Sequence, residues 1–177
     1  MKGRIKKTII IIGVLLFFFT NVFAQQMEFN DPQIISVVEA ISKIDMDYGE
    51  IALNRTQNNE VKEFAQAMIQ NYTYHFNQIL ALKKELILSI QTNEITRSLL
   101  KDKSENIKLL ESRKQKYFDI TYVDNEVAFH EAAVSILKNV LIPQARNDKL
   151  KNFLAKISPS WEQDLKTAKK IQDEINK

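Results

Sequence analysis

The sequence predicts an all-α protein, built as an antiparallel four-helix bundle with an extra helical connection between its second and third long helices. Apolar residues recur at alternating spacings of three and four over long segments, which is the pattern of a helix with one buried face. Glycine and proline occur only three times each in 177 residues. Such scarcity of turn-forming residues excludes a many-stranded β protein.

The first two helices are predicted over residues 31–55 and about 58–90. Asp31 is expected to be the N-cap of the first, with Pro32 at its first helical position. Each segment carries one continuous row of inward-facing positions. The first row is Ile34, Val38, Ile41, Asp45, Tyr48 and Ala52, and the second is Val61, Ala65, Met68, Tyr72, His75, Ile79, Leu82 and Leu86.

The connection between the second and third long helices is polar and mixed over residues 91–115, with a helix expected at about 95–111. The third long helix is predicted over about 115–141, ending before Pro143 because proline lacks the N–H that a helix needs. From sequence alone, the connection can either return directly or cross the length of the bundle.

The last helix is predicted from about residue 147 to 175. Pro159 interrupts its pattern, so the helix either kinks there or restarts with Ser158 as a new cap. Four long segments with one apolar stripe each are typical of a four-helix bundle.

Polar residues interrupt each apolar row near its middle. With a rise of about 1.5 Å per residue, these positions lie roughly 18–28 Å from the nearest predicted helix turn, in helices about 40 Å long. They therefore form a predicted polar layer near mid-bundle. Its members are Asp45 on the first helix, Tyr72 and His75 on the second, Asp164 on the last, and Glu126 and His130 on the third, whose polar face also carries Asp119 and Tyr122.

This layer has the residue types of a metal site. Bundle cores bind metals through side chains of facing helices, and carboxylates with imidazole suit iron, manganese or zinc. The predicted ligands are His130, Glu126, Asp45 and Asp164. Glu126 and His130 are spaced i, i+4, whereas the di-iron helices of ferritin-like proteins carry Glu-x-x-His at i, i+3.

The alternative is a structural layer without any ligand. Hydroxyls of Tyr48, Tyr72 and Tyr122 could satisfy the buried carboxylates and histidines in a closed hydrogen-bond network. Tyr72, His75, Asp119 and Tyr122 are predicted to support the layer rather than bind metal. Asp119 lies about 16 Å along its helix from His130, too far to share one ion.

Four stretches together resemble an exported bacterial family of unknown function with a ferritin-like bundle, often labelled an outer-membrane protein. They are DMDYGEIA (Asp45–Ala52), NEVKEFAQAMIQNYT (Asn59–Thr73), FDITYVDNEVAFH (Phe118–His130) and SPSWEQDL (Ser158–Leu165). The resemblance spans nearly all of the chain after residue 24, and it implies a ferritin-like fold.

The same resemblance bears on the site. The second stretch usually ends in Asp-His-Thr in that family, and the last usually reads Leu-Pro-x-Leu-x-x-His-Leu. Here Tyr72 and Asp164 stand where the family has histidines, while Asp119, Tyr122 and His130 match. The family carries no established activity to transfer.

The first 24 residues have the pattern of a secretory signal peptide. Four basic residues precede an apolar run over residues 8–19, and Val22-Phe23-Ala24 fits a cleavage site. An uncleaved membrane anchor is the alternative, although the run is short of the ~20 residues that a spanning helix needs. The domain then covers residues 25–177, without a membrane span. Cleavage would change the net charge from +3 to −1, because the four basic residues leave.

The composition excludes several functions. A near-neutral chain gives no indication of nucleic-acid binding, and the absence of cysteine excludes disulfides and lipidation at cysteine. No catalytic constellation stands out. The leading hypothesis is an exported, periplasmic or envelope-associated, non-catalytic protein with a polar mid-layer. The alternatives are a metal-binding, redox-active bundle and a helical module that binds an envelope partner.

Overall fold

The computed structural model describes residues 28–177, which form five long helices and no strand, so the all-α prediction is confirmed. The predicted signal peptide lies outside the described residues. Within the described part, no helix is long and apolar enough to cross a membrane. The helices are α1 (Asp31–Arg55), α2 (Asn59–Glu85), α3 (Glu94–Ser112), α4 (Gln115–Ile136) and α6 (Asp148–Ile175), with a π-helical turn η1 (Leu137–Leu141) and a short α5 (Ile142–Gln144) between the last two.

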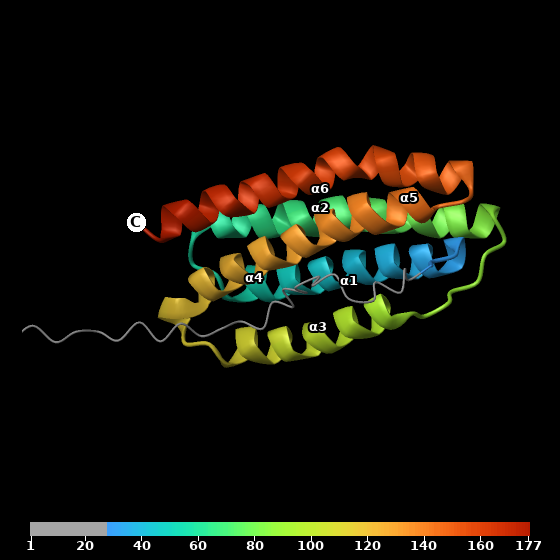
Figure 1. Ribbon diagram of the computed structural model, residues 1–177. Helices are drawn as coiled ribbons and strands as arrows, with labels where there is room; N and C mark the ends of the chain where they lie inside the picture. The colour runs from blue at the N-terminus through green and yellow to red at the C-terminus, as the bar shows by residue number, and fades with distance from the viewer. Residues whose placement is uncertain (1–27) are drawn as a thin grey trace, which may run out of the picture.

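Four of these helices form the bundle, in the order α1, α2, α6 and α4 around its axis (Figure 1). The α1–α2 and α4–α6 pairs make the most extensive contacts, and α2 with α6 and α1 with α4 close the ring. Every neighbouring pair is antiparallel. The apolar faces of all four helices meet inside, which explains the three-and-four spacing of the sequence.

The helix α3 lies outside the bundle and runs alongside α1, from one end of the bundle toward the other. At one end, the amide of Asn93 donates to the carbonyl of Gln33 at the start of α1. At the other end, the guanidinium of Arg55 donates to the carbonyls of Leu110 and Glu111. This connection, left open by the sequence, therefore carries the chain from the end of α2 to the opposite end of the bundle, where α4 begins.

The start of α1 differs by one residue from the prediction. Asn30, not Asp31, is the N-cap, because its side chain accepts from the backbone N–H of Gln33, and the Gln33 side chain accepts from Asn30 in return. The Asp31 carboxylate instead accepts from the backbone N–H groups of Arg146 and Asn147 at 2.9 and 3.1 Å. Asp31 thus joins the start of α1 to the turn before α6.

The helix α2 ends at Glu85, five residues before the predicted end at Ile90. The chain reverses at Ile87, whose φ of 53° lies in the left-handed region, and the N–H of Leu88 donates to the carbonyl of Lys83. This is the helix-ending geometry in which glycine is usual. Ile87 is 92% exposed, whereas Leu86 and Leu88 pack against the core from this turn, so the apolar pattern continues past the end of the helix.

Neither Pro143 nor Pro159 ends a helix. The prediction that the third long helix stops before Pro143 was therefore wrong. The turn at η1 widens to π geometry just ahead of Pro143, and the helical path continues to Gln144. A wider turn accommodates the missing N–H and the bulk of the ring. Pro159 lies on the exposed face of an unbroken α6, where water can reach the carbonyl it leaves unpaired, and Ser158 starts no new helix.

One glycine sets the closest approach between α1 and α2. A Cβ atom at Gly49 would lie 2.8 Å from Cγ1 of Ile69 and 3.1 Å from the carbonyl oxygen of Ala65. Only glycine therefore fits this crossing without displacing its neighbours. Gly49 follows Asp45 by one helical turn, so the tight crossing lies directly beside the polar layer.

Candidate metal centre

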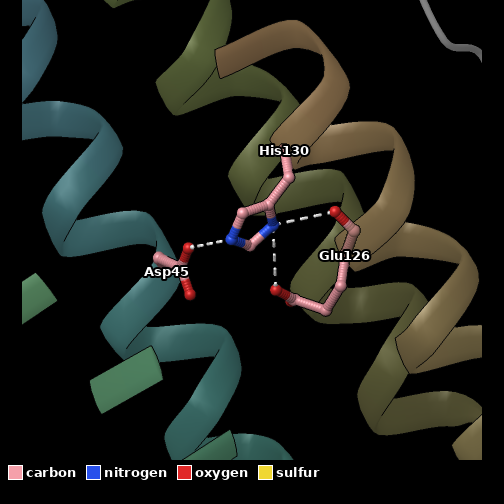
Figure 2. Close-up of side chains that lie close together, drawn as sticks. All are labelled: Asp45, Glu126 and His130. Carbon is pink, nitrogen blue, oxygen red and sulfur yellow. Dashed lines mark hydrogen bonds and ion pairs between the residues drawn. The ribbon is translucent and has the colours of Figure 1, made fainter. Parts of the chain in front are cut away.

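Three fully buried ionisable side chains meet in the middle of the bundle (Figure 2). Asp45 projects from α1, and Glu126 and His130 project from one face of α4, since residues four apart lie above one another on a helix. All three side chains have 0% exposure. Each offers one ligand atom within 4.8 Å of the other two. The i, i+4 pair and the aspartate predicted from sequence thus come together.

The backbone fixes the orientation of the His130 ring. Its Nδ1 lies 2.9 Å from the carbonyl oxygen of Glu126, and because that oxygen can only accept, Nδ1 carries the proton and donates. The Glu126 carboxylate lies 3.6 Å from the same nitrogen. The other nitrogen, Nε2, faces Oδ2 of Asp45 at 3.2 Å. This contact is within ion-pair distance, but it lacks the alignment of a hydrogen bond.

The polar atoms of this cluster are left unsatisfied. Both carboxylate oxygens of Asp45, both of Glu126 and Nε2 of His130 are buried, and within residues 28–177 none has a hydrogen-bond partner. The hydroxyls of Tyr72 and Tyr122 are also buried without partners in that range. Unpaired buried groups of this kind are costly and call for an explanation, such as a bound ion or water.

The closed tyrosine network considered from sequence is therefore absent from the described part of the chain. Tyr48 accepts a hydrogen bond from Asn106 of α3 at 3.3 Å. Tyr72 comes close enough to Asp45 for that carboxylate to raise its pKa, after the larger effect of burial, yet no aligned hydrogen bond forms between them.

Burial and mutual charge shift the protonation of the cluster. Burial alone would lower the pKa of His130, but the carboxylates of Asp45 and Glu126 outweigh it and raise the pKa to about 9. Burial, and then the charge of Asp45, hold the pKa of Glu126 well above its usual range. Without a metal, the cluster therefore retains protons that a cation would have to displace.

Aromatic rings enclose His130, and the sequence analysis did not identify two of them. The ring centroids of Phe64, Tyr72 and Phe129 lie 6.2, 5.9 and 5.8 Å from that of the imidazole. In the sequence Phe64 and Phe129 are ordinary apolar residues of helical stripes. In the sequence, the only indications that these rings lie near the cluster are that Phe64 precedes Met68 by one helical turn and that Phe129 directly precedes His130. The rings keep the dielectric low, which strengthens every charge interaction inside.

Asp164, the fourth predicted ligand, does not join the other three. It projects from α6, where its Oδ1 accepts from the amide of Asn71 at 3.3 Å, and its Oδ2 has no partner in the described chain. Burial raises its pKa to about 6, while the charge of His130 acts in the opposite direction. Asp164 is thus an electrostatic neighbour of the cluster and not part of the group within 4.8 Å.

The remaining polar-layer residues have structural contacts. His75 accepts a hydrogen bond from the indole of Trp161 at 3.4 Å, and burial lowers its pKa. Asp119 accepts from the hydroxyl of Thr56 at 2.6 Å, which ties α4 to the α1–α2 turn. Tyr122 stacks on Phe118. Asp119 is thus held at one end of the bundle, as its distance along the helix predicts.

Fold and site together define a class: an all-α bundle with a buried cluster of two carboxylates and an imidazole. Comparison with known families places the chain more closely, because the family described as Domain of unknown function (DUF4142) matches residues 20–171. The chain belongs to this family. No curated protein and no solved structure matched the chain. The resemblance to a family of unknown function is confirmed to that extent.

Proposed function

We propose that the protein binds one divalent transition-metal ion through Asp45, Glu126 and His130. The observation that carries the proposal is the set of five buried, unpaired ligand atoms on these three residues. One cation could take a ligand atom from each of the three residues. As the side chains are placed, the hydroxyls of Tyr72 and Tyr122 do not satisfy the carboxylates, because both hydroxyls are also without a hydrogen-bond partner in the described residues.

The geometry is close to that of a bound ion. Two ligand atoms about 2.1 Å from one ion lie at most about 4.2 Å apart, and Oδ2 of Asp45 already lies 3.2 Å from Nε2 of His130. The Glu126 carboxylate lies 3.6 Å from Nδ1, so it must turn toward Nε2 to share the same ion. The Nδ1–H of His130 donates to a backbone carbonyl, an arrangement that frees Nε2 as the ligand. Two carboxylates and a neutral imidazole balance a charge of 2+.

The donor set favours iron, manganese or zinc, since oxygen and imidazole ligands suit all three. We propose binding and retention of the ion as the role, without a catalytic step. Full burial of the ligands and the aromatic enclosure of His130 favour slow exchange of the ion over turnover of a substrate.

The setting that we infer is the cell envelope, in a ferritin-like bundle. The basic and apolar segments before Ala24 have the pattern of a secretory signal. Four antiparallel helices with a long crossover connection are the arrangement of ferritin-like folds. Secretion of an epitope-tagged chain, with cleavage after Ala24 established by mass spectrometry, tests the export.

A second candidate is a purely structural ion pair. The 3.2 Å contact between His130 Nε2 and Asp45, together with the raised pKa of His130, would suit an imidazolium that fixes helix register without metal. The two candidates differ in their response to added metal. In the structural pair, the protonated imidazole of His130 is already the cation, so an added ion brings no further stability.

Metal analysis of the protein purified without added chelator tests the proposal, followed by thermal unfolding with Fe²⁺, Mn²⁺ or Zn²⁺. We expect one ion per chain and a Tm that rises with ion concentration, because an ion that binds only the folded state stabilises it. Absence of bound metal, with no shift in Tm for any of the three ions, would leave the structural pair as the function of the cluster.

A further inference from the structure

We infer that the groove between α2 and α6 is the route by which a cation reaches the buried cluster, with Asp164 as its docking group. The inference rests on the proposed function and extends it to the path of the ion. The groove has a volume of about 300 Å³ and is lined by side chains of both helices. These include Glu60, Glu63, Phe64, Ala67, Asp164 and Thr167.

Asp164 is the observation that points to a ligand. It is 5% exposed, it lines the groove, and its Oδ2 is buried with no hydrogen-bond partner in residues 28–177. A carboxylate that lines the groove and has one unsatisfied oxygen just behind the wall can turn that oxygen toward a cation in transit.

The charge of the groove favours cations. Glu60, Glu63 and Asp164 line it against one base, Lys170. Carboxylates along a concave, partly enclosed surface concentrate cations near its wall and raise their rate of association. The two glutamates are exposed near the start of α2, whereas Asp164 lies deeper.

One aromatic side chain, Phe64, links the groove to the cluster. Phe64 lines the groove, and its ring packs against the imidazole of His130 with 6.2 Å between centroids. Phe64 is thus in contact with both the groove and the cluster. The charge of His130 also reaches Asp164, where it lowers the pKa of the carboxyl against the larger effect of burial. Displacement of the Phe64 side chain would connect the two.

The test measures the association and dissociation rates of Co²⁺, the probe ion, by stopped flow. Trp161, the one tryptophan of the sequence, packs 5.8 Å from Tyr72, which in turn packs against His130, so its fluorescence reports the loading of the cluster. Ala67→Phe fills the groove without a change of charge. We expect association and dissociation to slow by the same factor, about tenfold or more, with Kd and stoichiometry unchanged. Ala81→Phe, at another exposed alanine of α2, is the matched control and should exchange at the wild-type rate.

Two further variants keep the test decisive. Thr167→Phe fills the groove from α6 and should act like Ala67→Phe if that variant unfolds. Asp164→Asn removes the docking charge and should slow association at least fivefold, with one ion still bound at saturation. Wild-type rates in both groove-filling variants, with one Co²⁺ per chain, would overturn the route and leave the metal site standing. No Co²⁺ binding by the wild-type chain would overturn the proposed function itself.

Discussion

Two buried carboxylates on α1 have opposite surroundings. Glu39 is 4% exposed and pairs with Lys83 of α2 at 2.5 Å, and the lysine retains 20% exposure of its side chain. Asp45, six residues later, has no exposure, and both its oxygens lack a hydrogen-bond partner within the described residues. One helix thus carries a carboxylate already satisfied by the protein and another that is not.

The difference teaches how a structural ion pair and a ligand site can be distinguished. Glu39 meets a flexible lysine whose amine reaches water, so the pair needs nothing more. Asp45 meets an imidazole fixed by a backbone carbonyl, beside a second carboxylate, with aromatic rings on the other sides. Three predictions test this contrast.

The largest effect is expected from His130→Ala. Removing the imidazole leaves Asp45 and Glu126 facing each other in a dry interior, which should cost the metal-free protein about 3–5 kcal/mol of unfolding free energy. The stabilisation by Fe²⁺, Mn²⁺ or Zn²⁺ should also disappear. Urea denaturation with and without the ion measures both. His75→Ala is the control, because His75 bonds to Trp161 outside the cluster and should leave the response to metal intact. Undiminished metal stabilisation in His130→Ala would contradict the site.

The next effect is a dependence of stability on pH. The pKa of His130 is raised in the folded state to about 9, from an ordinary value of 6.5, so the folded protein holds this proton more tightly. The stability that the proton brings is fully present below pH 6.5 and lost as pH rises to 9, a change of roughly 3 kcal/mol for this shift. Burial raises the pKa of Glu126 as well, which acts in the same direction.

Denaturation of chelator-treated protein at pH 6 and pH 9 measures this change. With metal bound, the ion replaces the proton, so the loss of stability toward pH 9 should vanish. A metal-free protein that is equally stable at both values would show that His130 is neutral in the cluster throughout. The Asp45–His130 contact would then not be an ion pair.

Much of this site could be predicted from sequence, because helical periodicity determines which residues face inward. The rows through Asp45 and through Glu126 and His130 placed these residues in one layer, and the structure brings them together. Periodicity leaves the rotation and offset between helices undetermined. Asp164 faces inward as predicted, but its helix places it at the groove toward α2 instead of in the cluster.

Each error at the end of an element has its own physical cause. The apolar stripe past Glu85 resembles a longer helix, but the backbone leaves the helix at Ile87, and Leu86 and Leu88 contact the core from the turn. Asn30 and Asp31 are both good caps, and the neighbouring turn before α6 takes the aspartate. Pro143 predicted a helix end, but a π turn ahead of it carries the helix further. Two of these ends depend on local backbone geometry, and the choice between Asn30 and Asp31 depends on a contact with a segment distant in the sequence.

The smallest effect is expected from the carboxylate that the protein already satisfies. Glu39→Gln removes the ion pair with Lys83 but keeps the shape, and the partly exposed lysine side chain can turn its amine to water, so the cost should be about 1 kcal/mol or less. Its response to metal should equal that of the wild type. Asp45→Asn is the matched change on the same helix, and it should remove most of the metal stabilisation because an amide cannot neutralise the ion. Equal metal responses in the two variants would mean that Asp45 is a structural carboxylate like Glu39. A loss of several kcal/mol in Glu39→Gln would instead show that the α1–α2 ion pair is as essential to the bundle as its centre.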